Sequence, residues 1–574
     1  MPTEVLKLVG LEAEARRGLH GRVCGDGEIG MVRFQGSASL RRVERKMDMY
    51  RRSLLAALAA PVLAAPVLLP GAAHAAMPSR AKTLRVVPET LTTVLDPHFT
   101  TSFTTRDFSY LVYDTLFAVN DRWEPQPQMV DRWEVSEDRK VWSFVLRPGL
   151  TFHDGTPVTA EDCVASLRRW GSRDSLGGLM FQATESLESL DANSFRLTLK
   201  SPFGLVLDAL AKPGAMVPAI MPKRLAETPA TRAITEPVGS GPYRFVAQEY
   251  RPGDRIVLAR HDAYRPRSEP SVWASGGKVA HFERVELISM PDVATQVSSL
   301  LTGEVDYCER LPADVLAAFD RSRDVHVQVV SPFGYQGVLR FNHLRPPFND
   351  VRVRRAVMLA VDQTQYLPGV GGREEYQRLC RSMFGCGTPY ETVAGMPPAA
   401  DLDGARAMLR DAGVDFALPI VILHPADAPG IAALGLITQD LLTKLGFHVD
   451  LQSMDFNTFA GRRARHEGWN IFHTTTAVPD AQSPLQNTFV NAAGPNGGFP
   501  GWPEDAEVQR LRAAFAASGD AAERHRLAET IHKRAAELGF YMPLGQFLTP
   551  SAWRSDLADV PTGPAMFLWG IRRV

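Results

Sequence analysis

The chain has 574 residues, of which 45% are hydrophobic and 22% are charged, a balance typical of a soluble globular protein. Its formal net charge is -1 at pH 7, so neither nucleic acid nor an anionic membrane surface is favoured as a partner. Without the N-terminal signal described next, about 500 residues remain, enough for roughly three domains around a large buried core.

A short apolar stretch near the N-terminus, at 54–69, is interrupted by Pro61 and Pro66. A membrane-spanning helix needs roughly 20 apolar residues, and lipid cannot replace the hydrogen bonds that proline removes, so the stretch does not predict a span. The segment 73–75 after it reads Ala-His-Ala, a small-x-small cleavage pattern. With basic residues in front, this layout indicates a secretory signal, so we expect export to the periplasm and cleavage near Ala75.

Arg51 and Arg52 precede the apolar stretch and resemble an imperfect twin-arginine export motif, which leaves the Sec route open. We interpret residues 47–75 as the export signal. Because export signals begin at the N-terminus, residues 1–46 are interpreted as an upstream mis-start without a structural role. A buried N-terminal helix is the alternative interpretation of the apolar stretch.

Local patterns in the first half of the chain predict strands and hairpins. An apolar segment at 83–87 is typical of a strand. The segments 133–135 and 141–146 flank five polar residues, which indicates a hairpin. The glycine-rich turn at 238–243 opens another hairpin, whose return strand we place at 256–258.

Three helices are predicted by periodicity and capping. The first has one apolar face, formed by Phe108, Leu111, Val112, Thr115 and Leu116. Thr159 caps the second, with Asp162 three residues later in the manner of a capping box. The third, at 349–361, carries three arginines that we interpret as its solvated face: Arg352, Arg354 and Arg355.

Two β-α-β units follow, and such units require parallel strands with right-handed crossovers. The first comprises 285–290, 293–301 and 305–307, and the second comprises 420–423, 431–445 and 449–451. Gly303 stands where a helix C-cap glycine is expected. The mixture of hairpins and parallel units predicts an α/β protein with at least two lobes and mixed sheets.

The cysteines indicate one disulfide. Of the five, Cys24 precedes the export signal. Cys380 and Cys386 are close enough in sequence to close a small loop in an oxidising compartment, although two free thiols are the alternative. Cys163 and Cys308 are interpreted as buried apolar residues. The Cys/His spacing of a zinc site is missing from the sequence, so we expect no metal.

Motifs for catalysis are also missing from the sequence. It contains no G-x-S-x-G, H-E-x-x-H, G-x-x-x-x-G-K-[ST] or C-x-x-C motif. The 14 histidines are scattered without ligand spacing, and isolated histidines are usually structural. We therefore expect a binding function, with no enzymatic activity and no cofactor.

Five segments, in this order, resemble the extracytoplasmic solute-binding proteins of peptide-type ABC transporters, solute-binding family 5. They are LDPHFTTSFTTRDFSYLVYDTLF, PQMVDRWEVSEDRKVWSFVLRPGLTFHDGTPVTAEDCVASLRRW, EPVGSGPYRF, FNHLRPPFNDVRVRRAVMLAVD and IHKRAAELGFYMPLGQF. The resemblance extends over nearly all of 84–547.

The resemblance implies a bilobal periplasmic-binding-protein type II-like fold with a hinge between the lobes. The first lobe would span 77–331, with an inserted subdomain at about 116–235. The second lobe would span 332–544, and the tail 545–574 would return to the first. The implied function is capture of a small or peptide-like solute by a monomer, for delivery to an ABC permease and its ATPase. The alternatives are an exported hydrolase and a binding protein that serves a membrane sensor.

The ligand expected from the resemblance is not an ordinary dipeptide. Peptide-binding members hold the ligand's α-ammonium with an acid after a Gly-Trp pair; here Thr474 replaces the tryptophan, Ala477 replaces the acid, and Asp480 lies three residues late. Where dipeptide binders carry an arginine for the ligand carboxylate, His424 stands instead. A local shift that gives Asp480 the acid's role is the alternative.

These departures favour a neutral or polyhydroxylated ligand such as an oligosaccharide or a capped peptide, with nickel and haem left open. A buried ammonium without a carboxylate partner costs several kcal/mol, which opposes a zwitterionic dipeptide. The expected ligand contacts are Thr101, Ser102, Phe103, His424, Thr474, Thr475 and Asp480.

Overall fold

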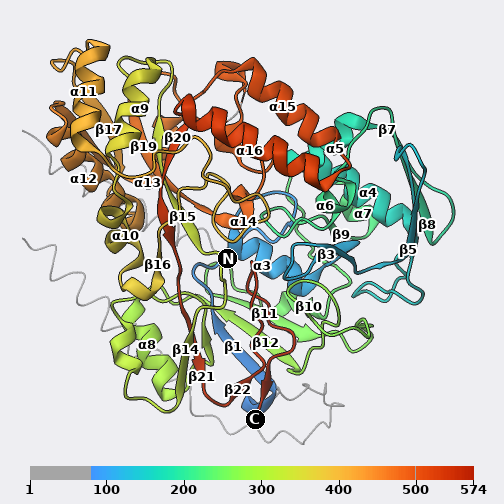
Figure 1. The fold of residues 1–574 in the computed structure, drawn as a ribbon. Helices are drawn as coiled ribbons and strands as arrows, with labels where there is room; N and C mark the ends of the chain where they lie inside the picture. The colour runs from blue at the N-terminus through green and yellow to red at the C-terminus, as the bar shows by residue number, and fades with distance from the viewer. Residues whose placement is uncertain (1–78, 498) are drawn as a thin grey trace, which may run out of the picture. The chain divides into compact units, whose positions relative to one another are not determined.

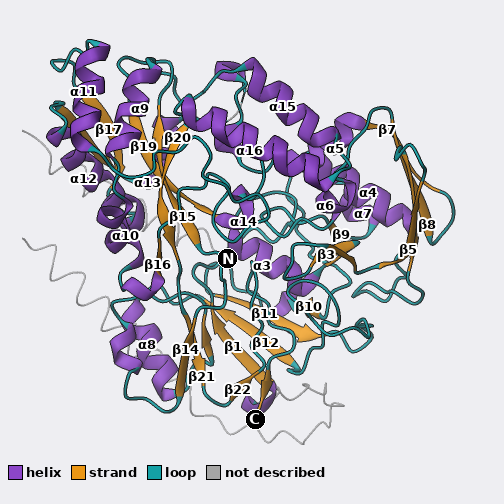
Figure 2. Ribbon diagram, in the orientation of Figure 1, coloured by secondary structure: helices purple, strands orange, loops and turns teal. Residues whose placement is uncertain are grey.

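The computed structural model describes residues 79–497 and 499–574, shown in Figure 1 and by secondary structure in Figure 2. The predicted export signal at 47–75 and the segment 1–46 lie outside the described residues. Within the described part of the chain, no helix has both the length and the apolar character needed to cross a membrane.

A seven-stranded mixed sheet forms the first lobe, in the order β10-β11-β12-β1-β13-β21-β14. Its strands are β1 (Thr83–Val87), β10 (Tyr243–Phe245), β11 (Arg255–Arg260), β12 (Arg284–Ile288), β13 (Tyr307–Cys308), β14 (Val325–Gln328) and β21 (Ser551–Arg554). β1 pairs in parallel with β12 and β13, and α8 (Val293–Thr302) connects these two, which confirms the first β-α-β unit. The predicted hairpin of β10 and β11 is confirmed by their antiparallel pairing.

A four-stranded antiparallel sheet, in the order β5-β6-β8-β7, lies in the segment between β1 and β10. Its strands are β5 (Val130–Val135), β6 (Val141–Leu146), β7 (Thr184–Ser189) and β8 (Ser194–Leu199). Helix α4 (Ala160–Gly171) packs against it and begins with the predicted capping box of Thr159 and Asp162. The helices α5 (Ser175–Ala183), α6 (Val206–Leu210) and α7 (Lys223–Ala226) follow. We call this part the subdomain.

The second lobe contains a six-stranded mixed sheet in the order β16-β20-β15-β19-β17-β18. Its strands are β15 (Tyr335–Phe341), β16 (Gln377–Arg378), β17 (Ile420–Pro425), β18 (Val449–Met454), β19 (Ile471–Ala477) and β20 (Tyr541–Phe547). β17 and β18 pair in parallel across α12 (Pro429–Lys444), which confirms the second β-α-β unit. Its core is built from side chains such as Leu339, Ile422, Leu434, Ile471 and Leu544.

The second-lobe segment of the chain also contains several helices, drawn in purple in Figure 2. They are α9 (Val351–Ala360), α10 (Gln363–Gly371), α11 (Leu402–Ala412), α13 (Phe456–Arg463), α14 (Val478–Ala481), α15 (Ala506–Ala517) and α16 (Ala521–Glu537). A disulfide joins Cys380 to Cys386 in the segment between α10 and α11.

The prediction that α9 exposes its three arginines is wrong at Arg354. Arg352 and Arg355 are exposed, but Arg354 is buried and donates hydrogen bonds to the carbonyl oxygens of Leu538 (2.8 Å) and Phe348 (2.5 Å). The carbonyls at a helix end lack partners within the helix, and Arg354 supplies one to the end of α16. Arg354 is therefore buried because it supplies a hydrogen bond to a carbonyl at the end of α16.

The first predicted helix also ends earlier than its apolar face suggested. α3 (Phe103–Val112) stops at Val112, and Thr115 lies in the short strand β2 (Asp114–Thr115), which pairs with β9 (Ala219–Ile220). Asp114 forms a buried ion pair with Lys278 at 2.8 Å. A buried carboxylate requires such a partner, and Asp114 finds it in β2, beyond the end of the helix.

The chain passes twice between the two large sheets. The segment 329–334 joins β14 to β15, and the segment 548–550 joins β20 to β21. Other short elements are the hairpin of β3 (Phe117–Val119) with β4 (Pro125–Pro127) and that of β22 (Leu557–Ala558) with β23 (Arg572–Arg573). Two short connections of this kind allow lobes to move about a hinge.

Candidate ligand site between the lobes

A cavity of about 460 Å³ lies between the two lobes. Its first-lobe wall contains Thr101, Phe103, Arg173, Asp174, Ser175, Lys212, Ala215 and Met216. Its second-lobe wall contains Arg463, residues 474–477, Asp480, Ala481, residues 486–489 and Phe499. Figure 1 shows α3 and α14, one from each wall, between the two large sheets. The volume lies in the range of pockets that bind small solutes.

The end of strand β19 gives the second-lobe wall its hydrogen-bonding groups. β15 pairs with β19 along its whole length, but β17 pairs only with Ile471 and Phe472. Beyond Phe472 one edge of the strand is therefore left for a ligand, as in binding by strand addition. The hydroxyls of Thr474 and Thr476 make only long 3.4 Å contacts with backbone oxygens, so they can turn to a ligand.

Asp480 connects the two walls. It lies in α14, which begins directly after β19 and has Pro479 in its first turn. Its Oδ1 accepts a hydrogen bond from the backbone N–H of Ala215 at 3.0 Å. Gly214 lets the chains approach this closely, because a Cβ there would lie 2.0 Å from Asp480 Oδ1. The carboxylate therefore bridges first and second lobe beside the cavity.

The first-lobe wall holds a buried ion pair, Lys212 with Asp174. Lys212 Nζ also donates to the carbonyl oxygen of Ala215 at 2.5 Å, and Asp174 caps α5 by accepting from the N–H of Gly177 at 2.8 Å. Both charges are thus satisfied within the first lobe. The pair organises the loop that presents Ala215 to Asp480.

Two arginines line the cavity without a carboxylate partner among the described residues. Arg173 stacks on Phe99, with its Cζ 5.2 Å from the ring centre, and donates to the Phe99 carbonyl oxygen at 3.2 Å. Arg463 reaches the cavity from the end of α13, on the second-lobe side. The cavity therefore carries positive charge on both walls.

The structure brings together five of the seven residues expected to contact ligand: Thr101, Phe103, Thr474, Thr475 and Asp480 all line the cavity. Ser102 is the N-cap residue of α3 and is not among the lining residues of the described chain. His424 is buried in β17 and also lies outside the lining, with Nδ1 facing Gly435 of α12. A contact between His424 and ligand is therefore not supported.

Several lining residues were missed from the sequence: Arg173, Asp174, Lys212, Arg463, Asn487, Phe489 and Phe499. They come from loops and helix ends that meet only in the folded chain. No local spacing in the sequence marks them. Within residues 79–497 and 499–574, no three His, Cys, Asp or Glu side chains gather as a metal site would require.

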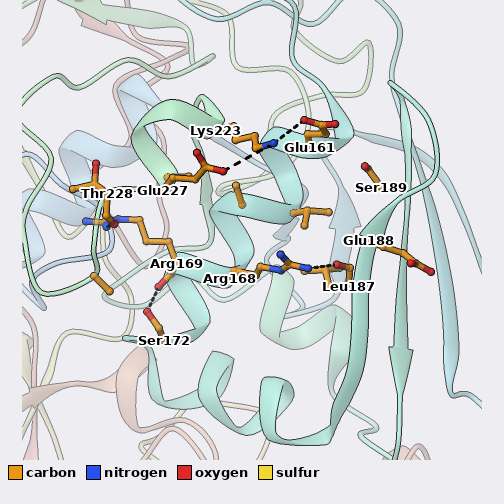
Figure 3. A pocket seen from close by; sticks show the side chains of 14 residues that line it. Glu161, Arg168, Arg169, Ser172, Leu187, Glu188, Ser189, Lys223, Glu227 and Thr228 are labelled. Carbon is orange, nitrogen blue, oxygen red and sulfur yellow. Dashed lines mark hydrogen bonds and ion pairs between the residues drawn. The ribbon is translucent and has the colours of Figure 1, made fainter.

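A separate cavity of about 590 Å³ lies on the subdomain and is drawn in Figure 3. Several of its charged groups are already engaged: Lys223 pairs with Glu161 at 3.0 Å, and Arg168 donates to the carbonyl oxygen of Leu187 at 2.7 Å. All of its lining residues belong to the subdomain, so closure of the two lobes would not enclose a solute there. We therefore assign the ligand site to the interlobe cavity.

Comparison with known proteins gives consistent matches. Residues 124–496 match the family model described as bacterial extracellular solute-binding proteins, family 5. The chain is 32% identical over 502 residues to a probable peptide ABC transporter periplasmic-binding protein of Sinorhizobium fredii, covering 86% of this chain and 93% of that protein. It is 23% identical over 473 residues to the nickel-binding periplasmic protein of Escherichia coli, covering 79% and 87%.

Solved structures show the same fold. The substrate-binding protein CtaP of Listeria monocytogenes matches with a TM-score of 0.72 and 19% identity, covering 84% of this chain and 97% of that one. The binding protein AgaA of A. tumefaciens R10, solved with agropinic acid, matches with a TM-score of 0.70 and 21% identity, covering 86% and 99%. The expected bilobal, mixed α/β fold is confirmed, and the chain belongs to the bacterial extracellular solute-binding proteins of family 5.

Proposed function

We propose that the protein encloses a polar solute in the interlobe cavity and hands it to the permease and ATPase of an ABC importer. As a family 5 solute-binding protein it is the substrate-binding component of a peptide-type importer. One observation carries the proposal: Asp480 bonds to Ala215 across the lobes, beside a cavity lined by uncommitted hydroxyls. Closure that buries a solute on all sides gives the permease a shape to recognise.

The solute we propose has hydroxyl or amide groups and no free dipeptide ammonium. The hydroxyls at 474–476 can donate and accept, which suits such groups. Asp480 already accepts from Ala215, so a ligand ammonium would have to share its charge with the closure contact. Micromolar binding of an unmodified dipeptide, abolished by Asp480→Asn, would overturn this choice of ligand.

The test is a thermal-shift screen of dipeptides, oligopeptides, oligosaccharides, nickel and haem, followed by small-angle scattering with each compound that raises the Tm. A bound solute stabilises the folded state by mass action, and closure should reduce the radius of gyration. The bound compound should be recovered unchanged by mass spectrometry, since we propose no turnover. Confirmed binding without a smaller radius would count against closure, and light scattering should show a monomer.

We also propose that the protein works in the periplasm after cleavage near Ala75, a site outside the described residues. Relatives are periplasmic binding proteins, which supports the location. N-terminal sequencing of the exported protein should start at or near Ala76. A mature chain that retains 54–69 would overturn the proposal, and replacing Arg51 and Arg52 by lysine should stop export only by the twin-arginine route.

A further inference from the structure

Arg463 presents a guanidinium to the interlobe cavity with no acceptor to bind it. It is the last residue of α13 and lines the cavity, as do Thr474 and Phe499. Across the described residues it donates no hydrogen bond and forms no ion pair. Its neighbour Arg462, in contrast, donates to Gln452 Oε1 at 2.6 Å and to the carbonyl oxygen of Gly468 at 2.8 Å.

Three phenylalanine rings surround this guanidinium. Its Cζ lies 5.2 Å from the ring centre of Phe459, 5.6 Å from that of Phe472 and 5.1 Å from that of Phe499. The rings attract the cation through their π faces but offer no acceptor to its N–H groups. Burial lowers the pKa of Arg463 below its ordinary value, because water no longer stabilises the charge there. The N–H groups of Arg463 are therefore free to bind an anion.

The carboxylates that line the cavity are not available to bind Arg463. Asp174 is paired with Lys212, and Asp480 is engaged with Ala215 on the first-lobe side. Arg173 adds a second cation on the first-lobe wall, held by Phe99. A solute that brings its own negative charge would therefore be favoured over a neutral one.

We infer that Arg463 is the receptor for a carboxylate of the bound solute, so that the solute is a carboxylic acid with hydroxyl or amide groups. A planar guanidinium binds a carboxylate through two parallel N–H···O bonds, and its aromatic surroundings hold it in place for this geometry. The threonines at 474–476 then bind the hydroxyl or amide groups. This assignment rests on the proposed function and replaces the neutral solute expected from the sequence.

A simple fluorinated carboxylate tests the receptor without knowledge of the natural solute. 4-Fluorobenzoate carries an apolar ring and one carboxylate, and its 19F line should broaden when it binds the exported protein. 4-Fluorobenzamide, its neutral counterpart, should not broaden. We expect Arg463→Gln to weaken 4-fluorobenzoate binding at least tenfold, and Arg463→Lys to give an intermediate loss because lysine lacks the planar fork.

The matched control is Arg465→Gln, since Arg465 is exposed and near Arg463 but outside the cavity lining. It should bind 4-fluorobenzoate as the wild type does. Equal broadening by the amide, unchanged binding by Arg463→Gln, or absence of broadening in the wild type would each overturn the receptor. Displacement of 4-fluorobenzoate by inorganic phosphate at similar concentration would overturn the carboxylate class in favour of phosphate.

These results are separable from those on the proposed function. If a neutral oligosaccharide closes the lobes while 4-fluorobenzoate fails to bind, capture stands and the carboxylate receptor falls. If 4-fluorobenzoate binds through Arg463 while no solute reduces the radius of gyration, the carboxylate receptor is supported and capture by closure is rejected.

Discussion

Asp480 Oδ1 in the second lobe accepts a hydrogen bond from the backbone N–H of Ala215 in the first lobe, at 3.0 Å and 265 positions away in sequence. The contact lies at the edge of the ligand cavity. Because an open arrangement of the lobes would break it, the bond contributes to the free energy of closure. We therefore expect this carboxylate to be one of the contacts that couple solute capture to lobe closure.

Removing this carboxylate should shift the lobes toward the open state. Asp480→Ala leaves the Ala215 N–H without its partner, and a hydrogen bond to a charged group contributes about 1.5–3 kcal/mol. We therefore expect solute affinity to fall roughly tenfold to a hundredfold. Asp480→Asn keeps an uncharged acceptor, so its solute affinity should lie between those of the wild type and Asp480→Ala.

Calorimetry and small-angle scattering on the liganded protein check this prediction. The control is Asp427→Ala, which removes an exposed carboxylate from the loop after β17. Wild-type affinity and radius of gyration in Asp480→Ala would contradict a role for the contact in closure.

A methyl group at Gly214 should oppose closure without removing any ligand contact. Its Cβ would lie 2.0 Å from Asp480 Oδ1, closer than two such atoms approach in proteins. Gly214→Ala should therefore keep the Tm of the unliganded protein but weaken solute binding and enlarge the liganded radius. Gly461→Ala is the control, because a Cβ there meets nothing within 4 Å. An unchanged affinity in Gly214→Ala would show that the lobes close by another path.

Elements whose ends depend on neighbouring residues were predictable from the sequence. The capping box joins Thr159 to Asp162, and Gly303 ends α8 in the left-handed conformation with a φ of 71°. The strands β5 and β6 are joined by a short polar turn. In each case the deciding contacts lie a few residues apart, so turn chemistry and periodicity identify them.

The ligand cavity was predictable only where the family resemblance supplied a register. Thr474 and Asp480 follow from the end of β19, whereas Arg463 and Lys212 enter from segments with no pattern of their own. His424 stays a prediction, because its imidazole lies against Gly435 of α12 and no residue of β17 is among those that line the cavity. These positions depend on contacts between segments far apart in the chain, and such contacts produce no local pattern in the sequence.

Thiol counts should report the disulfide of Cys380 and Cys386. Burial raises the pKa of the Cys308 thiol to about 12 and that of Cys163 further, so neither should react at pH 8 in the folded protein. Denaturation without reductant should expose these two thiols, and reduction should then expose all four cysteines of the segment 79–574. Four thiols before reduction would rule out the bridge.

Replacing both bridged cysteines by serine should lower the free energy of unfolding by roughly 2 kcal/mol in the loop-entropy model.

Stability should fall in mild acid because of His532, which is fully buried in α16. Its Nε2 accepts from the N–H of Met383 at 2.9 Å, and Nδ1 donates to the carbonyl oxygen of Ala394 at 2.8 Å, so the folded protein holds it neutral. Burial is the main reason that its pKa is lowered to about 4, from an ordinary 6.5.

Between pH 6.5 and about 4 the unfolded chain binds a proton at His532 that the folded protein does not. The free energy of unfolding should therefore be full above pH 6.5 and decrease as the pH falls, by at most about 1.4 kcal/mol per pH unit from this residue. His532→Gln keeps an acceptor and a donor without titrating, so urea unfolding at pH 7, 6 and 5 should show a slope smaller by about one proton. His281→Gln, at the surface, is the control. Equal slopes for wild type and His532→Gln would show that other groups cause the acid sensitivity.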